Sequence, residues 1–70
     1  MIMGSSNLQG REVIFEFTQF GHIVKVTAMD TKSRTEISIQ GPSSTAQSIL
    51  QTNALKRLEY VLKKKGIIKA

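Results

Sequence analysis

The chain has no cysteine, no tryptophan, one proline and one histidine in its 70 residues. Without cysteine it can form neither a disulfide nor a thiolate metal site, so a core this small must hold without either support. The same absence is typical of a protein from a reducing cytoplasm. A core near the minimum size also favours self-association, because a second copy of the chain buries further apolar surface.

Long apolar runs are missing as well. No stretch approaches the roughly 20 apolar residues that a membrane-spanning helix requires. The segment Met1-Ile2-Met3 is too short and too uncharged to act as a signal peptide, and Gly4 follows it at once. Hydrophobic residues make up 40% of the chain and charged residues 21%, which is typical of a globular domain. We therefore expect one soluble, cytoplasmic domain with no membrane partner.

Acidic residues are few, five against ten lysines and arginines, and the excess of positive charge lies at one end of the chain. Residues 1–54 hold four bases and four acids, whereas residues 55–70 hold six bases and one acid, Glu59. The six bases are Lys56, Arg57, Lys63, Lys64, Lys65 and Lys69. The basic end of this neutral body is the one surface that suggests a charged partner. The alternative is that these lysines are solvated and only complement the negative end of the helix dipole.

Three segments alternate between apolar and polar residues, which predicts half-buried β-strands. The apolar faces of these segments are Val13, Phe15 and Phe17, then Val24, Val26 and Ala28, then Ile37 and Ile39. Short polar connections between them predict an antiparallel meander. If Phe20-Gly21 is a two-residue turn, Phe17 lies opposite Val24, and Glu16 lies opposite Lys25 on the outer face.

The C-terminal part of the chain predicts one helix. Ser44 and Gln47 have the spacing of a capping box, with Ser44 as the N-cap. Apolar residues then recur at three- and four-residue steps, at Ala46, Leu50, Ala54, Leu58, Val61 and Leu62. Gly66 suits the left-handed position that ends a helix, and Ile67 can fold back on Leu62 in a Schellman motif.

A sheet with one apolar face and a helix with one apolar stripe must cover each other. The predicted fold is therefore α+β: a two-layer βββα domain in which a three-stranded antiparallel meander packs against one C-terminal helix. We expect a flexible tail over residues 1–10, the single domain over 11–66 and a C-terminal tail over 67–70. The predicted core consists of Phe15, Phe17, Val24, Val26, Ile37, Ile39, Leu50, Leu58 and Val61.

Catalytic chemistry is difficult to assemble from these residues. The histidine, His22, follows the predicted turn, and no motif brings it together with Ser33 and Asp30 as a triad. The carboxylates of Glu12, Glu16 and Glu36 fall on the outer sheet face, where solubility and pairing with a cross-strand lysine explain them better than acid–base catalysis. We therefore predict a protein that is not an enzyme, with no catalytic residue, no metal, no cofactor and no small-molecule substrate.

Four segments of the chain resemble a family of small uncharacterised bacterial proteins. The segments are Arg11–Phe17 (R-E-V-I-F-E-F), Val24–Ala28 (V-K-V-T-A), Thr35–Pro42 (T-E-I-S-I-Q-G-P) and the basic helix Asn53–Leu62. The resemblance covers about residues 11 to 65 and implies no assigned activity. Some members of that family carry a serine hydroxymethyltransferase label, which a chain this short contradicts, because that chemistry needs a large pyridoxal-phosphate pocket.

These observations favour a non-catalytic interaction domain whose partner is a protein, either a second copy of the chain or another protein. Ile14 and Ile23 fall on the outward face of the predicted sheet and are the candidate interface residues, and the first and third predicted strands leave open edges. The alternative is an accessory nucleic-acid-binding protein that uses the six bases of its C-terminal end as phosphate contacts. Asn53 is either hydrogen-bonded to the loop after the third strand or exposed.

Overall fold

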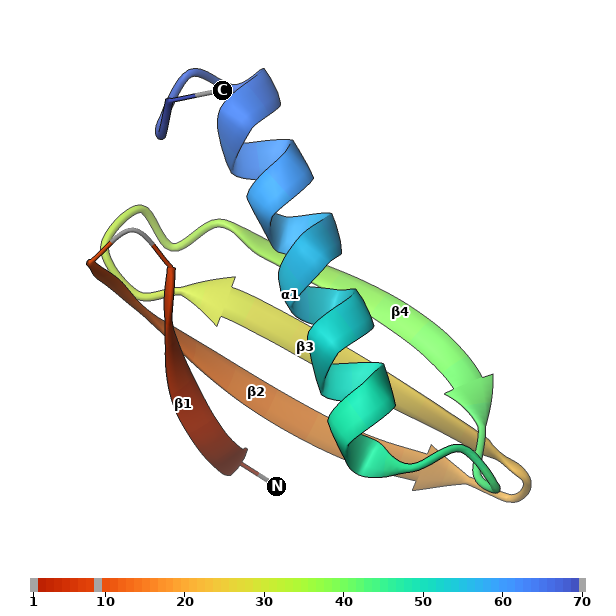
Figure 1. Ribbon diagram of the computed structural model, residues 1–70. Helices are drawn as coiled ribbons and strands as arrows, with labels where there is room; N and C mark the ends of the chain where they lie inside the picture. The colour runs from red at the N-terminus through yellow and green to blue at the C-terminus, as the bar shows by residue number, and fades with distance from the viewer. Residues whose placement is uncertain (1, 9, 70) are drawn as a thin grey trace.

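A computed structural model describes residues 2–8 and 10–69 (Figure 1). The elements follow one another as β1 (Ile2–Leu8), β2 (Arg11–Phe20), β3 (Ile23–Asp30), β4 (Glu36–Pro42) and α1 (Gln47–Lys64). The strands form one antiparallel sheet in the order β1-β2-β3-β4, and α1 crosses a single face of it. The predicted α+β class and the βββα arrangement of β2, β3, β4 and α1 are confirmed.

The N-terminal segment differs from the prediction of a flexible tail over residues 1–10. Residues 2–8 form β1, which pairs with β2 from Leu8 opposite Arg11 to Ile2 opposite Glu16, with an irregularity between Ile2 and Gly4. This segment has no apolar alternation, so its side-chain pattern carries no strand signal. The unpaired backbone groups along β2 provide a template for pairing instead, and β1 occupies that edge.

The hairpin between β2 and β3 turns one residue later than predicted. Its two turn residues are Gly21 and His22, with Gly21 at φ +59°, and Phe20 pairs with Ile23. Phe17 therefore lies opposite Val26 instead of Val24, and Lys25 lies opposite Thr18 instead of Glu16. Moving the turn by one residue shifts the pairing by two residues, so every side chain that was assigned to a strand face stays on that face. Phe20, predicted in the turn, instead ends β2. The alternation therefore predicts the faces but not the register.

The predicted capping box at the start of the helix is wrong. The helix begins at Gln47, and its N-cap is Ala46, which has no side-chain capping bond. The preceding residues are used in a turn, in which Thr45 N–H donates to the Pro42 carbonyl at 3.0 Å and Ser43 N–H donates to the His22 carbonyl at 2.8 Å. These bonds carry the chain from the sheet to the helix layer, so Ser44 lies outside the helix.

The predicted end of the helix is confirmed. Gly66 has φ +75°, and its N–H donates to the Lys63 carbonyl at 3.0 Å. The N–H of Ile67 donates to the Leu62 carbonyl at 2.9 Å, which completes a Schellman motif. The chain reverses at this point and brings Ile68 back to the core, where it is 8% exposed. Ile68 is therefore part of the domain and not of a C-terminal tail over 67–70.

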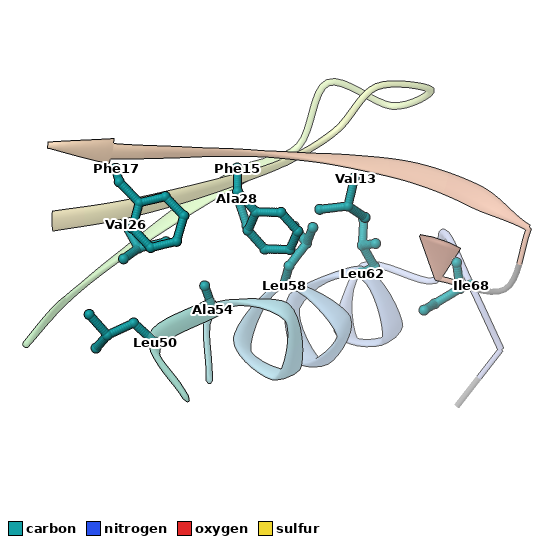
Figure 2. Close-up of a cluster of buried hydrophobic side chains, with 10 residues drawn as sticks. All are labelled: Val13, Phe15, Phe17, Val26, Ala28, Leu50, Ala54, Leu58, Leu62 and Ile68. Carbon is teal, nitrogen blue, oxygen red and sulfur yellow. The ribbon is translucent and has the colours of Figure 1, made fainter. Parts of the chain in front are cut away.

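The core lies between α1 and the inner face of the sheet (Figure 2). Its buried members are Val13, Phe15, Phe17, Val26, Ala28, Leu50, Ala54, Leu58, Leu62 and Ile68. Phe15 of β2 and Leu58 of α1 point toward one another at its centre. Of the predicted core, Val24, Ile37, Ile39 and Val61 are only half-buried. With the inner face committed to this core, the outer sheet face and the outward face of α1 are the surfaces left for partners.

Candidate functional site

The outer face of the sheet carries an exposed apolar patch, formed by Phe20, Ile23 and Pro42. The antiparallel register places Ile23 between the other two, opposite Phe20 on β2 and opposite Pro42 on β4. Phe20 is 61% exposed and Ile23 is 46% exposed. An open depression of about 330 Å³, lined by His22, Ile23, Gln40, Gly41 and Pro42, lies beside the patch. Large apolar side chains exposed at adjacent positions are typical of interaction surfaces.

The other end of the same face carries a second, smaller depression of about 160 Å³. Ile14 and Met29 lie opposite each other there, and both are half-buried. Glu16, Thr27 and Glu36 complete the lining. The two candidate interface residues, Ile14 and Ile23, thus share the predicted face but lie at opposite ends of it.

Phe20 is the interface candidate that sequence reasoning misses. The sequence pattern places it in the turn, where its side chain belongs to neither face. Aromatic residues are common in strands, so Phe20 could also have been read as the last residue of the strand before a Gly21-His22 turn. That reading would have placed Phe20 on the outer face. The open edges differ from the prediction too, because β1 covers the edge of β2. Within residues 2–8 and 10–69, the outer strands of the sheet are therefore β1, which pairs only with β2, and β4, which pairs only with β3.

The six bases predicted to contact phosphate lie on or just after α1. Lys56, Arg57, Lys63 and Lys64 belong to the helix, Lys65 is its C-cap residue and Lys69 lies in the segment that follows. Lys63 is half-buried and forms an i,i+4 ion pair with Glu59, with 3.3 Å between Nζ and Oε2, whereas the other five bases are exposed. Lys65 and Lys69 follow the last residue of α1, so the periodicity of the helix does not bring them to its outward face.

Tyr60 lies in the middle of these bases and is 53% exposed. The guanidinium carbon of Arg57 is 5.6 Å from the centre of its ring, and Nζ of Lys64 is 5.8 Å from it. Residues three and four apart are neighbours on a helix surface, so Lys56 and Lys63 also flank Tyr60. We call Lys56, Arg57, Tyr60, Lys63 and Lys64 the basic helix face. Asn53, two turns before Tyr60, is exposed.

Asp30 is fully buried at the end of β3 and is the centre of a polar cluster with Arg11 and Ser33. Arg11 Nη2 lies 3.0 Å from Asp30 Oδ2, and Ser33 donates to the same oxygen from its hydroxyl at 2.6 Å and from its backbone N–H at 3.1 Å. Burial by itself raises the pKa of Asp30, but the hydrogen bonds from Arg11 and Ser33 outweigh it and lower the pKa to about 2. The carboxylate therefore stays charged and holds the turn between β3 and β4.

His22 does not join this cluster. It lies in the turn before β3, whereas Asp30 and Ser33 lie at the far end of that strand. Eight residues of strand span roughly 26 Å, so the three side chains cannot act as a triad. The searched residues, 2–8 and 10–69, hold no group of three or more metal-ligating side chains. In the same part of the chain, no helix is both long and apolar enough to cross a bilayer.

The fold and these surfaces define a small α+β domain with an open sheet face and a basic helix. The chain belongs to a family known as a domain of unknown function, DUF6898, whose model matches residues 10–65. This match confirms the resemblance to an uncharacterised family, whereas it gives no support to a bacterial origin or to the serine hydroxymethyltransferase label. Comparison with characterised proteins and with solved structures gave no match.

Proposed function

We propose that this protein is a non-catalytic interaction domain that associates with a second copy of itself through the outer face of its sheet. The observation that carries the proposal is the pair formed by Phe20 and Ile23, which face each other across β2 and β3 with 61% and 46% of their surface exposed. Burying both side chains removes a large apolar area from water, which favours association.

The shape of the outer face supports a second copy as the partner. The apolar patch stands at one end of the face, and the depression beside Ile14 and Met29 lies at the other end. In a two-fold symmetric dimer each patch packs against the partner's depression, because a residue pair i–j recurs as j–i. Both Ile14 and Ile23 are then buried between the copies.

The charges on the outer face support the same arrangement. Glu12 and Glu36 lie near the depression, whereas Lys25 lies two residues from Ile23, next to the apolar patch. Stacking two faces in antiparallel fashion sets each Lys25 against the acidic end of the partner. Opposite charges across an interface determine its register and disfavour wrong partners.

Sedimentation equilibrium of the purified chain tests this proposal. We expect a concentration-dependent dimer for the wild type and a monomer for the double variant Phe20→Ser, Ile23→Thr. Ile49→Ser is the matched control, because Ile49 is 54% exposed but belongs to the helix layer. Lys25→Glu should weaken the dimer, and adding Glu36→Lys should restore it. A wild-type monomer at every concentration, or a dimer that the double variant leaves intact, would contradict the proposal.

A second candidate function, nucleic-acid binding, is favoured by one observation on the opposite layer. The ring of Tyr60 is half-exposed and is contacted by Arg57 and Lys64 at 5.6 Å and 5.8 Å. Exposed aromatic rings among lysine and arginine side chains are a recurring feature of protein surfaces that bind nucleic acids. Retention of the protein on immobilised nucleic acid that falls steeply with salt would support this function, and no retention at low salt would exclude it.

A further inference from the structure

The outward face of α1 concentrates positive charge around one aromatic ring. Four bases flank Tyr60 within about a turn of the helix on either side: Lys56, Arg57, Lys63 and Lys64. The single carboxylate in this stretch, Glu59, is paired with Lys63 at 3.3 Å. The apolar side of α1 is buried against the sheet through Leu50, Ala54, Leu58 and Leu62. The surface available to a partner is therefore polar, cationic and aromatic.

We infer that the basic helix face binds single-stranded nucleic acid, with an unpaired base stacked on Tyr60 and the neighbouring phosphates contacted by Arg57, Lys64 and Lys56. This inference rests on the second candidate function and specifies its ligand. The two cations, Arg57 and Lys64, lie over the ring of Tyr60. An incoming base therefore replaces a cation–ring contact, and the displaced cation is then free to pair with a phosphate. A base that stacks there brings its own backbone phosphates toward the same two cations.

Single strands fit this surface better than a duplex. Inside a duplex each base is stacked between its neighbours, so the ring of Tyr60 has no base face to contact except at the two ends. The other broad surface of the domain is unsuited to either form, because the carboxylates of Glu12 and Glu36 on the outer sheet face repel phosphates. A lipid surface fits poorly too, because interfacial helices insert an apolar face and that face of α1 is in the core.

Fluorescence anisotropy of the full chain with labelled oligonucleotides tests the inference. The probes are an oligothymidine of about 15 nucleotides, its RNA counterpart and a blunt duplex of equal length, titrated between about 50 and 200 mM salt. We expect single strands to bind more tightly than the duplex. Tyr60→Ala should weaken single-strand binding about 5-fold or more, whereas Tyr60→Phe keeps the stacking ring and should bind like the wild type.

The salt dependence provides an independent measure of the phosphate contacts. Lys56→Ala should lower the slope of log affinity against log salt by about 0.7 for a single strand. The control is Lys32→Ala, which removes an equal charge from the exposed loop between β3 and β4 and should leave affinity and slope unchanged. Circular dichroism of each variant checks that the fold is retained, which the half-exposure of Tyr60 leads us to expect.

Two results would overturn the inference in distinguishable ways. Equal affinity for duplex and single strand, with Tyr60→Ala unaffected, would contradict stacking and leave nucleic-acid binding as a function. No salt-sensitive binding to any of the three probes would contradict both the inference and the second candidate function. Binding to vesicles rich in anionic lipid, without binding to oligonucleotides, would likewise contradict both the inference and the second candidate function.

Discussion

Arg11 and Asp30 form an ion pair that joins the first residue of β2 to the last residue of β3. Arg11 Nη2 lies 3.0 Å from Asp30 Oδ2, and Nε donates to the same oxygen at 3.1 Å. The Asp30 side chain is fully buried and that of Arg11 is 16% exposed, so solvent screens the pair only weakly. Because Asp30 also accepts two hydrogen bonds from Ser33, one carboxylate holds both the hairpin and the next turn.

Replacing Asp30 with Asn should destabilise the domain by about 2 kcal/mol, because it removes the charge that pairs with the Arg11 guanidinium, and a hydrogen bond to a charged group contributes about 1.5–3 kcal/mol. Urea unfolding followed by circular dichroism measures the change. Glu12→Gln is the control, since Glu12 is an exposed carboxylate on the neighbouring strand β2. A loss no larger than that of the control would contradict the structural role of the carboxylate.

The same group predicts how stability depends on pH. The folded pKa of Asp30 is lowered to about 2, so between that value and the ordinary 3.8 the unfolded chain binds more protons than the folded one. The free energy of unfolding should therefore rise with pH across this window. The part of it that Asp30 contributes is present in full above about pH 4 and is lost as the pH falls toward 2. Asp30→Asn should flatten this part of the curve. Parallel curves for wild type and variant would contradict the assignment.

Replacing Gly41 with alanine should destabilise the domain. A Cβ at this position would lie 2.7 Å from Cδ2 of Leu50, which is 4% exposed in the core. Leu50 would have to move, so we expect Gly41→Ala to lower the free energy of unfolding by about 1–3 kcal/mol. Gln40→Ala, on the outward side of the same strand, should change it by less than about 0.5 kcal/mol.

A double-mutant cycle checks the mechanism at Gly41. In a Leu50→Ala background the colliding methyl group is absent, so adding Gly41→Ala should cost less than it does in the wild type. Purely additive losses would show that the contact with Leu50 is not the cause.

Gly66 should be replaceable only at a cost. It occupies the left-handed region at φ +75°, and a Cβ added there would have nothing within 4 Å, so the penalty is conformational and not steric. Gly66→Ala should lower the free energy of unfolding by about 1 kcal/mol, measured as a fall in the melting temperature. Gly66→Asn should cause a smaller loss, because asparagine tolerates the left-handed region better than alanine does. Equal losses for the two variants would contradict this explanation.

The existence of β2, β3, β4 and α1, and the face on which their alternating side chains lie, could be predicted from the amino-acid sequence, whereas the turn at Gly21-His22 and the start of the helix could not. Alternation assigns Val13, Phe15 and Phe17 to one face because successive strand residues point to opposite sides. The helix end is equally local, since glycine at position 66 and the following isoleucine suffice to define a Schellman motif. The bases of α1 and the outward position of Ile14 and Ile23 follow from the same periodicities.

Features that depend on distant backbone groups emerge only when the separate segments have folded together. The hairpin register is ambiguous in the sequence because a shift of two residues preserves every face, and the position of Phe20 beside Ile23 depends on that register. β1 exists because β2 offers an unpaired edge, which no side-chain pattern in residues 2–8 records. The cluster around Asp30 likewise needs Arg11, 19 residues away in the chain, at the end of β3. Periodicity acts over a few residues, whereas strand pairing and ion-pair geometry depend on how segments far apart in the chain meet.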